Sequence, residues 1–476
     1  MRAWTLSASL LVSLFAFDAF AQTIPTGDFP VAGYQGSFFL RDPNDWFILY
    51  PKGRLQVDDY NFLNRGDPPS GVDPNSAGDP RPRNTAFIRR ARIETQGTIF
   101  RHFDFQIGGE FASTPATGST GTVADAFIIV DYLSFLKVQA GQFDAPFTLE
   151  NRTSDKYFDF MERSLAVRAM GIPSNKDQGG MIWGWLPANV AYYSVGLFNG
   201  DGQNFKNQDN NLAVMGRAFV APLAPLRPIE RGRHWMQEIW LGGSFWWQYN
   251  NNLGGPVTPN NSGAAQNDLA AMTTQGGFTF FNSNYKNTDA MGNAVRSHLV
   301  PSRDQVKWAV EANIPINKIG ARFELVHQSV GLAQYNDGAA RTLANNAASL
   351  DGTAWYVELY GWILGDATFL ETPGVEPMPR LRRPYKVPEP KWGLMVAAKY
   401  EHLGMTVSGL NMGDPAQGNY SVDAFELGVN AWATKHVRLT ANYVMNYIDG
   451  DSTLVKKNIF WQQPEHELLF RIAIAL

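Results

Sequence analysis

The residues in this sequence most able to do chemistry are arginines and lysines that recur at short spacing. Arg90 and Arg92 occupy alternate positions, and a denser group without an acid between its members follows later: Arg380, Arg382, Arg383 and Lys386. A guanidinium group is planar, stays protonated and can hold two oxygens of one anion. These residue types therefore suggest reversible contact with anions.

Groups suited to catalysis or metal binding are scarce. Seven histidines, among them His102, His234 and His298, have no serine or aspartate at a recognisable spacing, and no Gly-x-Ser-x-Gly elbow is present. The absence of cysteine excludes a thiol nucleophile, a cysteine zinc site and a disulfide framework. The acidic pair Asp58 and Asp59 stands alone and is not an EF-hand loop. We expect no enzymatic activity, no metal site and no cofactor.

Composition narrows the class of protein. The 476 residues are 44% hydrophobic and 13% aromatic, which is far too much buriable surface for a disordered chain. The longest apolar run, residues 6–17, is shorter than the roughly 20 residues that a membrane-spanning helix needs. With 40 basic and 44 acidic residues, the net charge of −4 argues against a nucleic-acid partner. A large soluble β-rich protein or a membrane β-barrel remains.

The N-terminus has the pattern of a secretory signal. Arg2 precedes the apolar stretch 6–17, and Ala19-Phe20-Ala21 then provides small residues before Gln22. A buried N-terminal helix is the alternative, but the stretch has no polar face. We expect residues 1–21 to be a signal peptide that directs the protein out of the cytoplasm.

From residue 45 onward, segments of about ten residues alternate apolar and polar positions, and turn residues separate them. Phe103, Phe105 and Ile107, for example, alternate with Asp104 and Gln106. This period of two predicts strands with one apolar and one polar face. A soluble sandwich shows it too, whereas alternating short turns and longer loops are typical of a transmembrane barrel.

The connections follow that barrel pattern. One side has short turns near residues 100–102, 134–135, 186–189, 315–318 and 433–436, with two longer ones at 222–235 and 365–391. The other side has the connections 63–83, 112–121, 144–174, 200–211, 250–303, 331–350, 404–421 and 448–463. Seven turns and eight loops join sixteen strands, an even number that lets an antiparallel barrel close. The predicted fold class is all-β, a 16-stranded antiparallel transmembrane barrel.

Apolar and aromatic residues support a membrane setting. The last strand carries an apolar stripe to the end of the chain: Leu468, Phe470, Ile472, Ile474 and Leu476. Aromatic residues at strand ends are candidates for interfacial girdles: Trp46, Tyr50, Trp183, Trp185, Tyr192, Trp246, Trp247, Trp355, Tyr356, Trp432 and Tyr447. Ordinary core aromatics are the alternative.

Several stretches resemble the phosphate-selective porin O and P family. The most specific is Gly-Gln-Phe-Asp-Ala-Pro-Phe at residues 141–147, which continues to Phe-Met-Glu-Arg-Ser-Leu at 160–165. Further similar stretches lie at residues 87–94, 196–202, 355–366, 428–432 and 442–444. The resemblance implies a channel of the bacterial outer membrane, usually trimeric, with the third and fifth outer loops and a long periplasmic turn folded into the lumen.

In this chain those three inward connections are residues 144–174, 250–303 and 365–391. The chain then divides into a signal peptide at 1–21, an N-terminal lead-in at 22–45 and a porin barrel at 46–476.

Alternation also assigns the polar residues of the second strand. Four of them are predicted to face the lumen: Arg90, Arg92, Glu94 and Gln96. Arg89 is out of phase and is expected near the strand end, within reach of lipid headgroups. The lumen-facing arginines are candidates for contact with solute, and a wall lattice of salt bridges with Glu94 and Glu110 is the alternative.

Other basic residues extend the set of candidate pore-lining residues. The third loop provides Arg152, Lys156 and Arg163 among several acids, so a loop anchored to the wall is the alternative there. Arg217 shares the polar phase of its strand. The basic run at 380–386 is the best local anion candidate if its turn folds inward, and a solvated periplasmic face if it does not.

We therefore expect an outer-membrane diffusion channel for small hydrophilic solutes, with phosphate or other anions as the candidate favoured class. A strongly anion-selective pore needs an excess of luminal basic residues, but this chain is net acidic and its predicted lumen mixes both signs. The family name should therefore not be read as the substrate. A non-conducting structural or adhesion barrel is the alternative. The expected partners are small hydrophilic or anionic solutes, outer-membrane lipid and, as the resemblance implies, two further copies in a homotrimer, without nucleic acid.

Overall fold

A computed structural model describes most of the chain beyond residue 29. The described residues are 30–63, 82–112, 121–172, 174–207, 210–226, 234–250, 268–289, 291–337, 342–375, 378–382, 385–388, 391–458 and 464–476. The predicted signal peptide at 1–21, the first part of the lead-in and Arg383 lie outside them. The domain boundaries therefore stay predictions.

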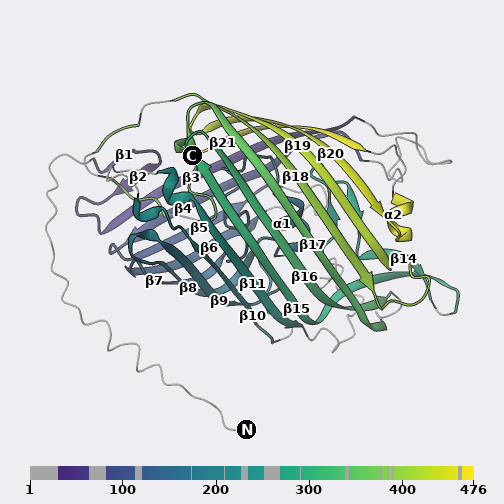
Figure 1. Cartoon of the computed structure of the whole chain (residues 1–476). Helices are drawn as coiled ribbons and strands as arrows, with labels where there is room; N and C mark the ends of the chain where they lie inside the picture. The colour runs from purple at the N-terminus through teal and green to yellow at the C-terminus, as the bar shows by residue number, and fades with distance from the viewer. Residues whose placement is uncertain are drawn as a thin grey trace, which may run out of the picture.

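Sixteen antiparallel strands form one closed barrel, whose walls run obliquely around a central lumen (Figure 1). They are β3 (Phe47–Phe62), β4 (Thr85–Ile99), β5 (Phe103–Glu110), β6 (Thr122–Leu133), β7 (Leu136–Asp144), β8 (Lys176–Trp185), β9 (Ala191–Phe198), β10 (Ala213–Val220), β11 (Trp240–Asn250), β15 (Ala294–Ile316), β16 (Ile319–Asn336), β17 (Thr342–Leu364), β18 (Gly393–Ser408), β19 (Gly418–Thr434), β20 (Val437–Gly450) and β21 (Glu465–Ala475).

Each barrel strand pairs with the next one along the wall, and β11 pairs directly with β15. The last strand closes the barrel on the first, in the register Ala475↔Arg54 to Glu467↔Phe62. Closure leaves no open edge among these sixteen barrel strands, so their backbone groups in the hydrocarbon layer are paired. The predicted 16-stranded barrel is confirmed.

In the barrel wall, apolar side chains lie on the outside and polar side chains on the inside, the reverse of a soluble protein. The apolar side chains of Ile93 and Ile107 are 68% and 64% exposed on the outside, whereas Glu94 and Gln106 beside them are buried inside. The C-terminal stripe also faces outward, with Ile472 exposed and Arg471 buried. The structure confirms the predicted alternation, with its apolar face outward as the membrane requires.

The prediction of aromatic girdles was wrong for about half of the residues. Trp46, Trp247 and Tyr447 lie exposed on the outer face as expected. Six others are buried: Tyr50, Trp183, Tyr192, Trp246, Tyr356 and Trp432. They occupy lumen-facing positions, where several pack against inserted loops or the turn 365–392, so strand-end position alone did not decide which face they take.

Several strands run farther than predicted. The connection expected at residues 331–350 shrinks to 337–341, because β16 and β17 continue in register to Asn336↔Thr342. Much of the expected loop 250–303 is also ordered, since β15 begins at Ala294 and β14 (Asn284–Thr288) pairs with it. These extensions mix small and polar residues with a few buried apolar ones such as Leu332 and Tyr335, so the regular alternation ends before the hydrogen-bonded strand does.

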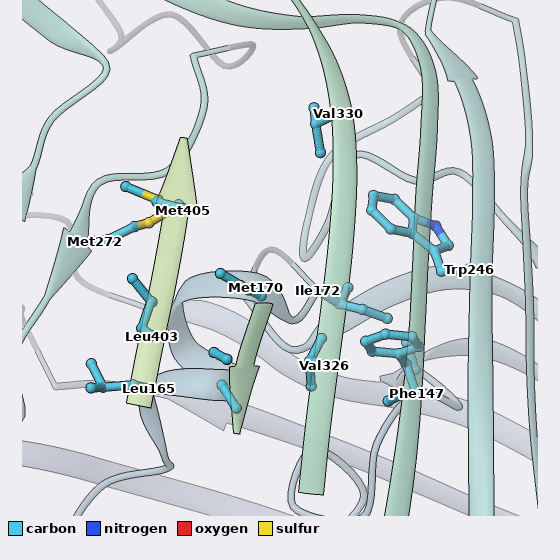
Figure 2. Packing of buried hydrophobic residues seen from close by; sticks show 14 of the residues in the cluster. Phe147, Leu165, Met170, Ile172, Trp246, Met272, Val326, Val330, Leu403 and Met405 are labelled. Atoms are coloured by element: carbon cyan, nitrogen blue, oxygen red, sulfur yellow. The ribbon is translucent and has the colours of Figure 1, made fainter. Parts of the chain in front are cut away.

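The third loop, residues 145–175, occupies the lumen with a short helix, α1 (Leu165–Met170). Figure 2 shows Met170 of this loop between the wall side chains Leu403 and Val326, and Leu165 and Ile172 belong to the same packed cluster. Thus part of the lumen is a dry hydrophobic core, whereas the alternation pattern alone predicted a wet lumen throughout.

The fifth connection also turns inward. It contains the small hairpin β12 (Met272–Thr273) and β13 (Thr279–Phe281). The backbone N–H of Gly276 donates to the wall carboxylate of Glu467 at 2.7 Å. The Arg168 guanidinium of α1 donates to the carbonyl of Thr273 at 2.7 Å. The inward course implied by the resemblance is confirmed for the described part of this loop.

Smaller elements lie at the two ends of the barrel. At the loop end, α2 (Thr453–Asn458) follows β20. At the turn end, β1 (Ala32–Tyr34) and β2 (Phe38–Arg41) form a hairpin that extends the sheet from β3. The remaining elements are the 3-10 helices η2 (Pro187–Asn189), η3 (Ala224–Leu226), η4 (Trp235–Glu238) and η5 (Ala367–Phe369). Within the described residues, no helix is long and apolar enough to cross a membrane.

Candidate functional site

The third loop is fixed to the lumen wall through its backbone. The N–H of Leu165 donates to the carboxylate of Glu401 at 2.6 Å, and the N–H of Met161 donates to the amide oxygen of Asn442 at 3.0 Å. The N–H of Leu149 donates to Glu324. These wall groups satisfy an irregular backbone in a place with little water. The predicted inward position of the third loop is confirmed.

The basic residues of this loop have different surroundings. Arg152 is buried and donates to the carbonyl oxygen of Asp144, so it supports the loop. The Arg163 guanidinium lies 4.7 Å from the ring centre of Phe158 and donates to the carbonyl of Glu150 at 3.3 Å. Lys156 is partly buried. Contact of these three residues with solute stays a prediction.

Three arginines of the wall gather around one carboxylate of the loop. Arg54 on β3 and Arg90 and Arg92 on β4 all point to Asp155. The nitrogen–oxygen distances are 2.7 Å for Arg90 and 3.6 Å for Arg92, and Arg54 donates to the second carboxylate oxygen. The predicted luminal orientation of Arg90 and Arg92 is confirmed.

The alternative salt-bridge lattice is also present. Arg92 lies 2.6 Å from Glu110 and 4.0 Å from Glu94, the two acids expected to balance it. Arg90 donates to the amide oxygen of Gln56 at 2.7 Å. The same arginines therefore brace the wall and face the loop.

The prediction that Arg89 reaches lipid headgroups was wrong. A β-bulge shifts the register, so that Gln56 pairs with Arg90 and Val57 with Ile88. The extra residue turns Arg89 toward the inside, where it holds both oxygens of Glu162 at 2.9 and 3.1 Å. A bulge of this kind re-aims a side chain, and a strict period of two does not anticipate it.

The turn 365–392 folds inward beneath the third loop. The N–H of Gly374 donates to the Thr153 hydroxyl at 2.7 Å, and the carbonyl of Gly374 accepts from Arg217. Arg217 is fully buried and forms a two-point ion pair with Glu311 at 2.6 and 2.9 Å. Arg217 therefore faces the lumen as predicted, but its guanidinium is committed to a wall acid and to this turn.

The basic run of the turn divides into two parts. Arg380 reaches the wall and pairs with Asp104 at 2.6 Å and Asp131 at 3.0 Å. Arg382 and Lys386 are exposed at the turn end, where the backbone of Arg382 exchanges two hydrogen bonds with the Gln35 side chain. Wall acids therefore balance the charge of Arg380, whereas Arg382 and Lys386 face solvent.

Two neighbouring cavities run along the wall beside the third loop. The larger, about 210 Å³, reaches the loop end at Ala112 and Gln203 and includes the arginines around Asp155. The smaller, about 30 Å³, reaches the turn end at Ser37 and His436. A cavity needs roughly 10 to 15 Å³ to hold a water molecule, so both are large enough for water.

Three residues line both cavities, namely Lys52, Lys156 and Glu371. The Tyr157 hydroxyl donates to Glu371 at 3.0 Å. Burial alone would raise the pKa of the Glu371 carboxyl, yet Lys156, Lys52 and Lys435 with this hydrogen bond hold the pKa below its usual value. The carboxylate is therefore charged where the cavities meet.

Comparison with known proteins supports the family resemblance. Residues 70–230 match the family model described as phosphate-selective porin O and P. The chain is also 28% identical to Porin O of Pseudomonas aeruginosa over 192 residues, which are 40% of this chain and 42% of that protein. The resemblance to the phosphate-selective porin O and P family is confirmed. The matched segment spans less than half of the length of that relative.

Solved structures with a similar fold include the outer membrane channel DcaP of Acinetobacter baumannii and an anion-selective porin from Comamonas acidovorans. Each is 9% identical with a TM-score of 0.45, and each comparison covers at least 90% of this chain and the whole of the other. Nothing about solute or selectivity passes to this chain at that level of similarity. The family match and the closed barrel with an apolar outer face confirm the predicted outer-membrane location.

The stretch most specific to the porin family has a structural reason for its glycine. Gly141 has a φ of +132°, and a Cβ placed there would lie 2.1 Å from the carbonyl oxygen of Ala126. Only glycine fits that position. The following Phe143, Ala145 and Phe147 are fully buried in the core between the loop and the wall.

Sequence reasoning missed several residues of the path. Lys52, Glu371 and Lys435 line the cavities, and Arg54 completes the group around Asp155. Lys52 and Arg54 are neighbours on β3, whereas Asp155, Glu371 and Lys435 come to them from distant parts of the sequence. For Arg54, the alternation of its strand was the sequence signal that could have predicted a lumen-facing side chain. Among the described residues, no cluster of histidines and acids is arranged to hold a metal ion.

Proposed function

We propose that this protein is an outer-membrane diffusion channel for small hydrophilic solutes, with a modest preference for anions. One observation carries the proposal. Two cavities, each large enough for water, share lining residues along the wall and together extend from the loop end to the turn end. Lys52, Lys156 and Glu371, which line both, would form the narrowest section. The porin family and the barrel favour a channel over an enzyme.

The charges along the path support a modest preference and no strict phosphate specificity. Eight basic and six acidic side chains line the larger cavity. Selectivity in such a pore follows the excess of one sign among the lining groups. Most of these arginines are already paired with carboxylates, so few donors remain for a multivalent anion. Phosphate is therefore one admitted solute among other small anions.

Conductance measurements test the proposal. Purified protein in a planar bilayer should form ohmic channels, and a salt gradient should give a reversal potential on the anion side but far from the ideal value. Liposomes that contain the protein should swell in small sugars. Folded protein that gives neither current nor swelling would contradict the channel.

The second candidate is a non-conducting structural or adhesion barrel. The hydrophobic packing between the third loop and the far wall favours it, because this core blocks that half of the lumen. The absence of sugar uptake by folded protein, together with surface binding through the fifth loop, would support this alternative.

The family resemblance also supports a homotrimer in the membrane. Unheated protein should then migrate as a trimer in a denaturing gel and as a monomer after boiling. A monomer under both conditions, with the barrel still folded, would contradict the trimer.

A further inference from the structure

Asp155 occupies the place that a bound oxyanion would take in the larger cavity. One of its carboxylate oxygens faces Arg54, and the other lies 2.7 Å from Arg90 and 3.6 Å from Arg92. Guanidinium groups that converge in this way bind the two oxygens of a carboxylate, or two oxygens of a phosphate, by the same donor geometry. The third loop therefore places the carboxylate of Asp155 in a site formed by three arginines of the wall.

Within the ion-paired group at this site, the charges balance only when the acids of the loop are included. Five arginines of the wall form one connected group of ion pairs: Arg54, Arg89, Arg90, Arg92 and Arg471. The wall carboxylates paired with them, among the described residues, are Asp58, Glu94 and Glu110. The excess of two positive charges is cancelled by two acids of the third loop, Asp155 and Glu162.

The two loop acids differ in their surroundings. Glu162, shortly before α1 in the loop, pairs with Arg89 and Arg471 of the wall and accepts a hydrogen bond from the Tyr60 hydroxyl at 3.5 Å. Asp155 lines the water-sized cavity together with its neighbours Ser154 and Lys156. Of these two acids, only Asp155 is among the residues that line the cavity, so a solute would meet it first.

Groups other than Asp155 also hold the loop in position. The backbone on either side is fixed by other groups, with Thr153 bonded to Gly374 at 2.7 Å and Met161 to Asn442 at 3.0 Å. Removal of one partner from a buried ion pair leaves the other charge uncompensated. Here the cavity is large enough for water, so an anion from solution could take the vacated position.

We propose that Asp155 is the specificity-determining residue of this pore, a built-in counter-ion that fills an oxyanion site formed by Arg54, Arg90 and Arg92. While it is there, permeating anions compete with it and pass with little retention. Without its charge, the same three arginines would bind a small oxyanion, and the channel would become strongly anion-selective. This inference rests on the proposed channel function.

The variant Asp155→Asn tests it against Asp125→Asn. Asp125 lines the same cavity, but its described ion pair is with Lys176 at 2.6 Å. Both variants remove one negative charge. We expect the reversal potential of Asp155→Asn to move strongly toward the anion limit, and inorganic phosphate to block its chloride current at a concentration at least tenfold lower than in the wild type. Asp125→Asn should show a clearly smaller effect on both.

Equal effects of the two variants would overturn the inference, because they would show a general influence of charge. An unchanged Asp155→Asn pore would overturn it too. A second variant covers misfolding of the first: Arg54→Gln removes one donor while Asp155 stays, and should move the reversal potential toward cations. A shift of Arg54→Gln toward anions contradicts the model.

Calorimetric titration of inorganic phosphate into the detergent-solubilised protein tests the oxyanion site separately from the proposed channel function. Binding by Asp155→Asn and not by the wild type supports the oxyanion site even if no current is seen, and absence of binding by folded Asp155→Asn overturns it. Absence of current in the folded wild type overturns only the proposed channel.

Discussion

Buried ion pairs hold the inserted parts of this barrel to its wall. Arg217 and Glu311 have no side-chain exposure at all, and the same guanidinium also binds the carbonyl of Gly374. In such surroundings the attraction matters less for net stability than the cost of leaving one charge without its partner. The pair therefore fixes the position of the turn 365–392.

We predict that Glu311→Gln lowers the free energy of unfolding by about 3 to 5 kcal/mol, because it strands the Arg217 guanidinium. Urea unfolding in lipid vesicles measures this loss. The double variant Arg217→Met with Glu311→Leu removes both charges and should lose much less. A loss by the double variant as large as that of the single one would contradict the argument.

The pH dependence of selectivity reports on Asp155. Burial alone would raise the pKa of its carboxyl, but the guanidinium groups of Arg54, Arg90 and Arg92 hold the pKa well below the usual value. A depressed pKa means that the carboxylate stays charged as the pH falls through the ordinary aspartate value of about 3.9. Its contribution to stability is likewise lost only below that value.

We therefore predict that the difference in reversal potential between the wild type and Asp155→Asn persists from about pH 7 to about pH 4. The other acids of the cavity are present in both proteins, so their effect on the reversal potential is removed when the two are compared. A difference that disappears between about pH 6 and about pH 5, above the ordinary aspartate pKa of about 3.9, would show that the pKa of Asp155 is raised and that the three arginines do not hold its charge.

At the residue scale, the sequence predicted orientation where a strand is regular. Arg90 and Arg92 face the lumen because alternation continues through them. Arg89 does not follow the same rule, since the bulge that turns it inward depends on pairing with β3. Lys52 and Glu371 gain their importance from meeting across more than 300 positions, which no local pattern records.

At the scale of elements, the register between β6 and β7 depends on one glycine. Gly141 lies opposite Phe127 and Gly179, with a backbone conformation that side chains rarely adopt. Gly180 beside it is different, because a Cβ there would meet only the carbonyl of Gln139 at 3.6 Å. The two positions offer a matched pair in the same sheet.

We predict that Gly141→Ala destabilises the barrel by about 1 to 3 kcal/mol, the usual cost of a strained backbone conformation. Gly180→Ala should change stability by no more than about 0.5 kcal/mol. Midpoints of heat-induced unfolding, read from gel mobility, compare the two. Equal midpoints would show that the wall relaxes around an alanine at position 141.

The sequence predicted the number and pairing of elements better than their lengths. Sixteen strands and the inward third loop follow from alternation, turn residues and family resemblance. The ends of β16 and β17 were misplaced because the apolar pattern stops at the membrane, whereas the strands continue into water. The hydrophobic core under α1 was not predicted, because Leu165 and Met170 meet their wall partners only after the loop has folded inward.

At the scale of the whole molecule, the lumen is divided into two halves. A hydrophobic core packs the third and fifth loops against one part of the wall, and a charged path remains along the other part, beside β3 to β6. Among the described residues, the inserted loops therefore fill the first part of the lumen, and the two cavities mark the proposed route along the second.

The absence of cysteine makes that route directly testable. Ser154 lines the larger cavity and Ser37 the smaller one, whereas Ser408 is exposed near the loop end of β18 and outside both. Single cysteines at these positions can be modified with a charged, membrane-impermeant thiol reagent while the current is recorded. Mass spectrometry confirms that each cysteine has reacted.

If solutes pass along the wall beside the third loop, modification of Ser154→Cys and Ser37→Cys should lower the single-channel current by about half or more, because the added group occupies a narrow path. Modified Ser408→Cys should conduct like the wild type. Complete modification at Ser154→Cys with an unchanged current would contradict the claim and would place the permeation route elsewhere in the barrel.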